Sequence, residues 1–363
     1  MFPASSQCAI WLALQESAEK PSRGQLERQL ACGVSPIEIL RRTVGRRRVE
    51  PLVDRAQEQI ERWAAQGISL LCPADERFPG LLGTIPDPPR LLFLRGDLDC
   101  LEAPTVAVVG ARRASVLGLE IAQGLARGLT ARGFVVISGL ALGIDSAAHR
   151  GALDHGRTVA VLGSGLNRVQ PVTNARLARD ILAAGGLHVS EYLPTLHARP
   201  HHFPERNRLI SGLARGVVVE AGERSGSLIT ARLALEQGRE VMAVPGSLGH
   251  GNSKGCHRLT KEGAALVEDA QDVADALGFL TANPGESEFA EADTAAGTPG
   301  VTLPPRLLEV FRAIGQTTTG IDEICGLMSL PAMAVSAILS ELEVEGFVQR
   351  VTDGYIRRPF PPS

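Results

Sequence analysis

The chain has 363 residues, of which 44% are hydrophobic, so it is long enough for two or three domains with cores of their own and far from the composition of disordered chains. Its formal net charge of −3 excludes a global basic field, so any nucleic-acid site has to be a local patch. The six cysteines are scattered, without C-x-x-C or zinc-ligand spacing, which predicts reduced thiols and no metal site.

Residues 1–72 are predicted to form a small N-terminal helical domain of the SAM or helix-hairpin-helix kind. Apolar positions recur at helical spacing in residues 9–19, 24–32, 35–41 and 50–66. The apolar run from Cys8 to Leu14 is much shorter than the ~18 residues that a membrane span needs. No positive charge precedes this run and acidic residues follow it, so we expect neither a signal peptide nor a membrane segment, and a cytoplasmic location.

Residues 73–280 change to an alternation of short apolar runs and helical stretches. A proline-rich passage over residues 78–90 leads into Leu91–Leu94. The runs that follow are residues 106–109, 134–137, 158–162, 187–189, 217–219 and 241–244. Most of them are fully apolar, as in parallel strands that are buried on both faces. The pattern therefore predicts an α/β fold, with a Rossmann-like, doubly wound and mostly parallel sheet.

The C-terminal part reads as a linker and a third domain. Residues 281–302 are poor in apolar side chains and predict a flexible linker. Residues 303–363 restore helical periodicity and end in a hairpin, which predicts a winged-helix domain. Its third helix, over residues 331–345, contains no Lys, Arg, Asn or Gln, and residues 303–358 hold five arginines against seven acids. We therefore expect protein contacts or an auxiliary DNA contact here, and the main DNA site elsewhere.

The first motif that points to chemistry ends the apolar run 106–109 and continues into Gly110-Ala111-Arg112-Arg113. A buried strand that enters a tight turn and then a helix presents free backbone N–H groups, which bind anions. An arginine beside them suits phosphate. A plain strand-to-helix turn with a solvent-exposed arginine is the competing interpretation.

A second motif runs from Ser138-Gly139 through Gly143 to Asp145 and His149. Asp145 and His149 are four residues apart, so they share a helix face and could form an acid–base pair. A helix-capping aspartate and a hydrogen-bonded histidine that fix the loop form the alternative, and we favour it.

Further loops rich in glycine, serine and arginine follow the later strands. They contain Gly163, Gly165 and Asn167; Arg206, Asn207 and Arg208; and Ser225, Gly226 and Ser227. One of the two motif arginines could instead belong to a structural network with Glu205 or Glu220. In an open α/β sheet the carboxyl ends of the strands lie on one edge, where ligands bind. Several phosphate-binding loops in a row favour a polyphosphate strand over a single small cofactor.

With these motifs the chain resembles the DprA/Smf family. The matching stretches are V-A-V-V-G-A-R, S-G-L-A-x-G-I-D-x-x-A-H, V-L-G-x-G, F-P-x-R-N-R-x-I, E-A-x-x-x-S-G-S-L-I-T-A and A-V-P-G, in this order. The resemblance implies binding of single-stranded DNA, a homodimer, and delivery of DNA to the recombinase RecA in natural transformation and homologous recombination. It gives Arg112 the role of phosphate-binding arginine and makes Arg206 and Arg208 basic contacts. Leu259 and the stretch from Ala264 to Val267 are candidates for the dimer contact.

The rival interpretation is an enzyme. Phosphoribohydrolases of the lysine-decarboxylase-like class have a related sheet, but their catalytic glutamate would fall near Thr230 here, so the acid–base role has no carboxylate. A nicotinamide dehydrogenase lacks support because the G-x-G-x-x-G fingerprint and the acidic residue after the second strand are missing. We therefore expect no cofactor and no catalytic residues.

Overall fold

The computed structural model describes residues 4–222, 225–246, 253–279, 304–314, 319–328, 330–344, 347–351 and 354–357. The chain divides into two compact units, residues 1–280 and 281–363. The linker predicted at residues 281–302 lies outside the described residues.

Four helices open the first unit: α1 (Ala4–Glu16), α2 (Arg23–Ala31), α3 (Pro36–Val44) and α4 (Arg46–Ala64). The apolar run Cys8–Leu14 lies in α1 and is buried, because α1 packs against α3 and α4 and is covered on all sides. These helices share one apolar cluster with the sheet, where the rings of Trp63 and Phe93 meet edge to face with centroids 5.4 Å apart.

Nine strands of the described residues form one sheet in the order β1-β2-β6-β5-β4-β3-β7-β8-β9. The strands are β1 (Ser69–Leu71), β2 (Leu92–Gly96), β3 (Thr105–Gly110), β4 (Val135–Ser138), β5 (Thr158–Val161), β6 (Leu187–Ser190), β7 (Gly216–Glu220), β8 (Glu240–Ala243) and β9 (Ala265–Leu266). Strands from β6 through β9 pair in parallel, whereas β2 pairs antiparallel with β1 and β6. The predicted Rossmann-like, mostly parallel sheet is confirmed.

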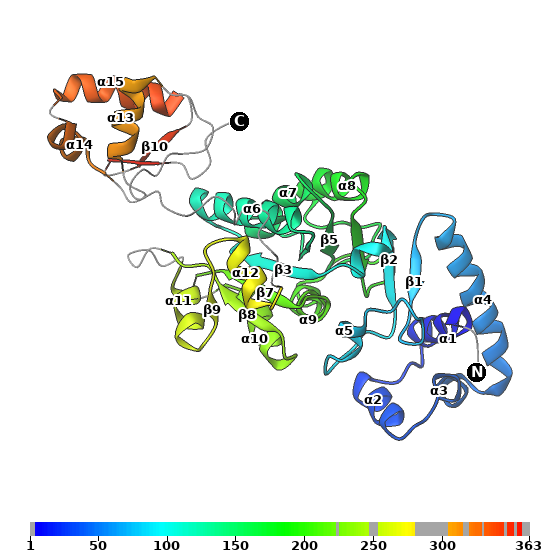
Figure 1. Ribbon diagram of the computed structural model, residues 1–363. Coiled ribbons are helices and arrows are strands. Elements are labelled where there is room, and N and C mark those ends of the chain that lie inside the picture. Colours follow the sequence, from blue (N-terminus) through cyan, green and yellow to red (C-terminus); the bar gives the residue numbers. More distant parts are fainter. Residues whose placement is uncertain are drawn as a thin grey trace. The chain divides into compact units, whose positions relative to one another are not determined.

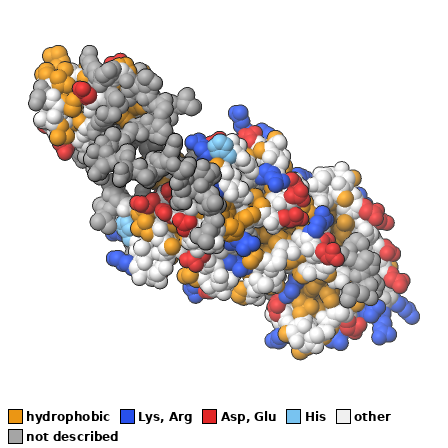
Figure 2. Space-filling model, in the orientation of Figure 1, with side chains coloured by type: hydrophobic (Ala, Val, Ile, Leu, Met, Phe, Trp, Pro, Cys, Tyr) orange, Lys and Arg blue, Asp and Glu red, His pale blue; other side chains and the backbone are white. Residues whose placement is uncertain are grey.

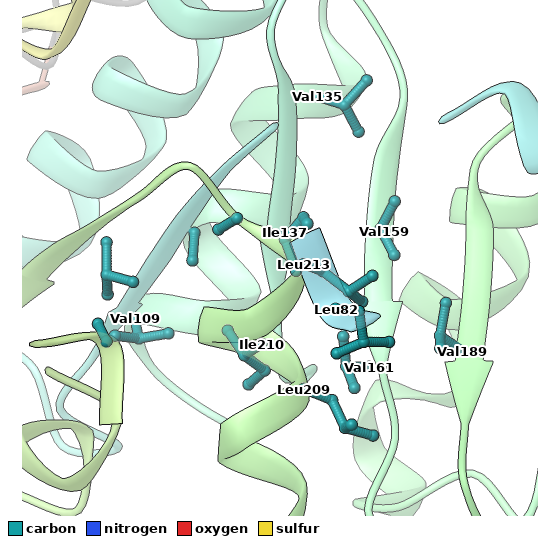
Figure 3. Close-up of a cluster of buried hydrophobic side chains, with 14 of the residues drawn as sticks. Leu82, Val109, Val135, Ile137, Val159, Val161, Val189, Leu209, Ile210 and Leu213 are labelled. Atoms are coloured by element: carbon teal, nitrogen blue, oxygen red, sulfur yellow. The ribbon is translucent and has the colours of Figure 1, made fainter. Parts of the chain in front are cut away.

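Helices cover both faces of this sheet, as Figure 1 shows. They are α5 (Gly80–Gly83), α6 (Val116–Ala131), α7 (Ile144–Leu153), α8 (Ala175–Ala183), α9 (His202–Leu213), α10 (Ser227–Glu236), α11 (Lys254–Lys261) and α12 (Ala270–Ala276), with short 3-10 turns at Leu98–Leu101 and Val172–Asn174. Figure 3 shows how strand residues of one face meet α9: Val109, Ile137, Val161 and Val189 face Leu209, Ile210 and Leu213. The strands are apolar on both faces because α6, α7 and α12 cover the other side.

The strand order reverses between β3 and β7. Strands β4, β5 and β6 follow β3 in one direction across the sheet, and β7, β8 and β9 extend in the other. In an open α/β sheet this switch point leaves a crevice at the carboxyl ends of the strands. Gly110 at the end of β3 pairs with Glu220 at the end of β7, which places the crevice at these two residues.

The second unit contains α13 (Pro305–Ala313), α14 (Ile321–Met328), α15 (Ala332–Val344) and the antiparallel hairpin of β10 (Val348–Val351) and β11 (Gly354–Arg357). Val335, Ile338 and Leu339 of α15 are buried in its core. Three helices and a hairpin confirm the predicted winged helix. In the described ranges no single helix is long and apolar enough to cross a membrane, and one bent pair, α14 with α15 at 111°, passes by length and composition alone.

Candidate nucleic-acid interface

A cavity of about 720 Å³ opens at the switch point of the sheet. We call it the switch-point cavity. The loops after β3, β4 and β7 and the first turns of α9 and α10 line it, and its charged lining residues are Arg112, Arg113, Arg206 and Asp145. With three arginines against one aspartate, this is a local positive site on a chain of slightly negative net charge.

Arg112 and Arg113 lie at the exposed mouth of the switch-point cavity. The guanidinium carbon of Arg112 is 5.5 Å from the ring centroid of Phe203, which lies in the second position of α9. No carboxylate among the described residues lies within ion-pair distance of either arginine, so their charge is available to a ligand.

Arg206 forms the floor of the switch-point cavity and is only 3% exposed. One of its terminal nitrogens donates to the carbonyl of Val161 at 2.5 Å, and its Nε has no hydrogen-bond partner among the described residues. Burial lowers the pKa of Arg206 to about 10, so the guanidinium remains charged at neutral pH. Gly139 makes this placement possible, because a Cβ there would overlap Nη1 of Arg206.

Asp145 is the carboxylate that accompanies this buried cation. Its Oδ2 accepts hydrogen bonds from the backbone N–H groups of Gly139 at 3.1 Å and Ala141 at 3.4 Å, so it holds the loop after β4. Burial raises the pKa of Asp145, and the charge of Arg206 opposes the rise.

His149 does not pair with Asp145. Its Nδ1 lies 2.8 Å from the Thr158 hydroxyl, which itself donates to the carbonyl of Val136, so His149 must be the donor. Burial lowers the pKa of His149 to about 3 and keeps the ring neutral. Of the two interpretations of this motif, the structural one is favoured, although Asp145 holds the preceding loop rather than capping a helix.

The first turn of α10 supplies the neutral groups of the switch-point cavity. Ser225, Gly226 and Ser227 line it together with Asn207 of α9. The two serine hydroxyls are 2.7 Å apart, and the free N–H groups at the start of α10 belong to the positive end of the helix dipole.

Several predicted site residues lie behind or beside the cavity. Ser138 donates to the carbonyl of Val108 at 2.6 Å, and Gly143 adopts a φ of 82° just before α7, so both shape the loop. Gly163 lies against the Phe203 ring, and Gly165 lies against the backbone of residues 193 and 194. These four residues are not among those that line the cavity.

Arg208 is not brought to the switch-point cavity. Its guanidinium donates to Asp87 at 2.6 Å and to both carboxylate oxygens of Glu191 at 2.7 Å, and it lines a separate cavity of about 280 Å³. Asn167 lies elsewhere too, and its side-chain oxygen accepts from Arg95 at 2.7 Å.

Phe203 and Asp145 line the cavity although their motifs did not mark them as binding residues. Phe203 stands beside Pro204 in the motif that was interpreted through its arginines, and an aromatic residue at the start of a helix in such a motif was the available signal. In the described ranges no three His, Cys, Asp or Glu side chains gather as metal ligands.

Fold and cavity together define a Rossmann-like domain with a cationic ligand site. Residues 69–278 match the family described as DNA recombination-mediator protein A, and residues 294–354 match the DprA winged helix domain. The chain therefore belongs to the DprA/Smf family.

Relatives cover most of the chain. Protein Smf of Escherichia coli strain K12 is 41% identical over 302 residues, which are 81% of this chain and 79% of that protein. A crystal structure of DprA from Streptococcus pneumoniae is similar with a TM-score of 0.61 at 38% identity, covering 76% of this chain and 98% of that one. A structure of DprA from Helicobacter pylori, described for its single-stranded DNA binding mode, has a TM-score of 0.52 at 30% identity and covers 58% of this chain and 95% of that one.

Proposed function

We propose that this protein binds single-stranded DNA in the switch-point cavity and acts as a recombination mediator without catalytic turnover. The observation that carries the proposal is the convergence of Arg112, Arg113 and the buried Arg206 on one cavity. A buried, permanently charged guanidinium attracts phosphate from below, and the two exposed arginines contact it directly.

Single strands fit this cavity better than duplex. The Phe203 ring lies at the cavity under the guanidinium of Arg112, and base stacking on such a ring requires an unpaired base. Aromatic residues make up only 4% of the chain, so phosphate contacts dominate and sequence preference is weak.

The DNA-contacting set that we propose is smaller than the set of motif residues. It contains Gly110, Arg112, Arg113, Asn207, Ser225, Gly226 and Ser227, with Arg206 acting from the floor. Ser138, Gly139, Gly143, Gly163 and Gly165 would act by shaping loops. Arg208, with both carboxylate partners in place, would act in stability rather than in DNA binding.

We further propose, on family membership, that the protein works in the cytoplasm as a homodimer that delivers DNA to RecA during natural transformation and recombination. The sheet edge at β9 supports a dimer contact, because Leu266 is 50% exposed there. Leu259 and Val267 are buried in the core, so they would support this contact from beneath.

An enzyme with the related sheet finds less support. Thr230 lines the cavity where a phosphoribohydrolase would need its glutamate, and it is 2% exposed. Asp145 already accepts backbone hydrogen bonds, and the neutral His149 is bonded to Thr158. No positioned acid–base pair is formed by these groups.

The test is a binding titration of Arg112→Ala with an oligothymidylate at several salt concentrations. Loss of a charge-assisted phosphate hydrogen bond of roughly 1.5–3 kcal/mol should weaken binding by about tenfold or more. Arg112→Lys should restore binding only in part, because lysine keeps the charge without the planar fork.

Arg232→Ala serves as the matched control, since Arg232 lies exposed on α10, pairs with Glu236 at 2.9 Å and does not line the cavity. A folded Arg112→Ala protein that binds the oligonucleotide as tightly as the control would refute the proposal.

A further inference from the structure

A second cavity, of about 650 Å³, lies beside α8. We call it the α8 cavity. Residues 166–170, which follow β5, line it together with α8, and Arg95 and His188 line it from the neighbouring strands β2 and β6. It shares no lining residue with the switch-point cavity.

The charged residues that line the α8 cavity are all arginines: Arg95, Arg168 and Arg179. No carboxylate lines it. Arg168 and Arg179 are exposed, and no described carboxylate lies within ion-pair distance of either. By contrast, Arg176, one turn earlier on α8, lies 3.9 Å from Asp180 and does not line the cavity. A concave surface with three cations and no acid attracts polyanions.

Arg95 is held in place within this group. Its guanidinium donates to the side-chain oxygen of Asn167 at 2.7 Å and to the carbonyl of Leu166 at 3.4 Å. These bonds use two of its five N–H donors, so others remain for a ligand. The Asn167 of the Gly-Ser-Gly-Leu-Asn motif thus has a task away from the switch-point cavity, as an orienting partner of Arg95.

His188 adds no charge to the α8 cavity. It is 2% exposed, neither ring nitrogen makes a well-formed hydrogen bond, and the Ala178 carbonyl lies nearby. Burial lowers its pKa to about 4, so the ring is neutral at pH 7. The attraction for anions therefore comes from the arginines.

We propose that the α8 cavity is a second phosphate-binding site, which takes backbone phosphates of the DNA strand that occupies the switch-point cavity. This inference rests on the proposed function. Segments after β3, β4 and β7 build the first site, and segments after β5 and β6 contribute to the second. Strands β4 and β5 are neighbours in the sheet, about 4.8 Å apart, so the two sites lie along one edge.

Oligonucleotide length separates the two sites. An oligothymidylate of about 5 nucleotides should occupy the switch-point cavity alone, and one of about 20 nucleotides should reach both. The double variant Arg168→Ala with Arg179→Ala should bind the short oligonucleotide like wild type and the long one about tenfold more weakly. The salt slope for the long one should fall by about 1.4, at about 0.7 per lost phosphate contact.

Arg176→Ala is the matched control, because it removes an exposed α8 arginine that does not line the cavity. Unchanged binding of the long oligonucleotide by the double variant, or equal weakening for both lengths, would overturn the inference. Inorganic phosphate that binds wild type but not the double variant, with long-oligonucleotide affinity unchanged, would assign the cavity to a free anion and also overturn it. Failure of the proposed function is a separate result, because it shows as undiminished binding by Arg112→Ala.

Discussion

Arg206 and Arg208 are two positions apart on α9 and therefore point to different sides of the helix. Arg206 enters the interior beneath the switch-point cavity, where its charge is balanced by the nearby Asp145. Arg208 points toward Asp87 and Glu191 and is 12% exposed. A buried charge is costly unless it is compensated, so removing either partner of such a group is expected to destabilise the fold.

Glu220 gives a pH dependence that can be measured. It lies at the end of β7, its Oε2 has no hydrogen-bond partner among the described residues, and burial raises its pKa from 4.5 to about 7. The folded state therefore binds a proton more tightly than the unfolded state, so this contribution to stability is full below pH 4.5 and is lost as pH rises through 7. We expect Glu220→Gln to remove that loss and to be more stable than wild type at pH 8.

The measurement is chemical denaturation of wild type and Glu220→Gln at pH 5 and pH 8. His149 and His188 act with the opposite sign, because their lowered pKa values destabilise the fold as pH falls below 6.5, and they are common to both proteins. Glu240→Gln, at an exposed carboxyl at the start of β8, is the control. Equal pH dependence in wild type and Glu220→Gln would contradict the assignment.

At the scale of single elements, the loop after β4 depends on close approach to α9. Because a Cβ at Gly139 would overlap the buried guanidinium of Arg206, Gly139→Ala should displace that side chain. We expect a loss of about 1–3 kcal/mol in unfolding free energy, as for overpacked cores, and weaker binding of single-stranded DNA.

Gly226→Ala makes the matched comparison for this loop. Gly226 also lines the switch-point cavity, has a φ of −64°, and leaves open space around the position that a Cβ would take, with no atom within 4 Å. It should keep wild-type stability in denaturant titrations. If Gly139→Ala is as stable as Gly226→Ala, the tight contact with Arg206 is not what fixes the loop.

Elements were predictable where burial leaves a simple pattern. The parallel strands are apolar on both faces, so their runs stand out in the sequence, and each predicted run overlaps a strand. Ends were less predictable. The helix predicted to start at residue 50 begins at Arg46, because Pro51, a residue favoured in the first turn, lies inside α4. The domain boundary at residue 72 stays a prediction.

At the scale of the whole molecule, charge is distributed locally. Figure 2 shows basic, acidic and hydrophobic side chains interspersed over the visible face of the first unit. With a net charge of −3, binding of a polyanion depends on where arginines gather without acids, as they do in the α8 cavity.

The candidate site was predictable in part for the same reason. Arg112 and the serines at residues 225 and 227 follow strands directly, and parallel strands bring their carboxyl ends to one edge. The side toward which Arg208 points and the contact between Arg95 and Asn167 depend on tertiary packing, which joins residues 72 positions apart in the chain. No local pattern carries that information.

The winged helix gives the last prediction. Its helix α15 carries no basic residue, has Val335, Ile338 and Leu339 in its core, and exposes Met333 and Val344 instead of groups that contact phosphate or base edges. The switch-point and α8 cavities both lie within residues 1–280, which form a compact unit. Deleting residues 281–363 should therefore leave the affinity for single-stranded DNA within a few-fold of the full chain, measured by titration at fixed salt. The same truncated protein should still sediment as a dimer if β9 supplies the contact. A fragment of residues 301–363 that binds DNA as tightly as the whole protein would show that the main site lies in the winged helix.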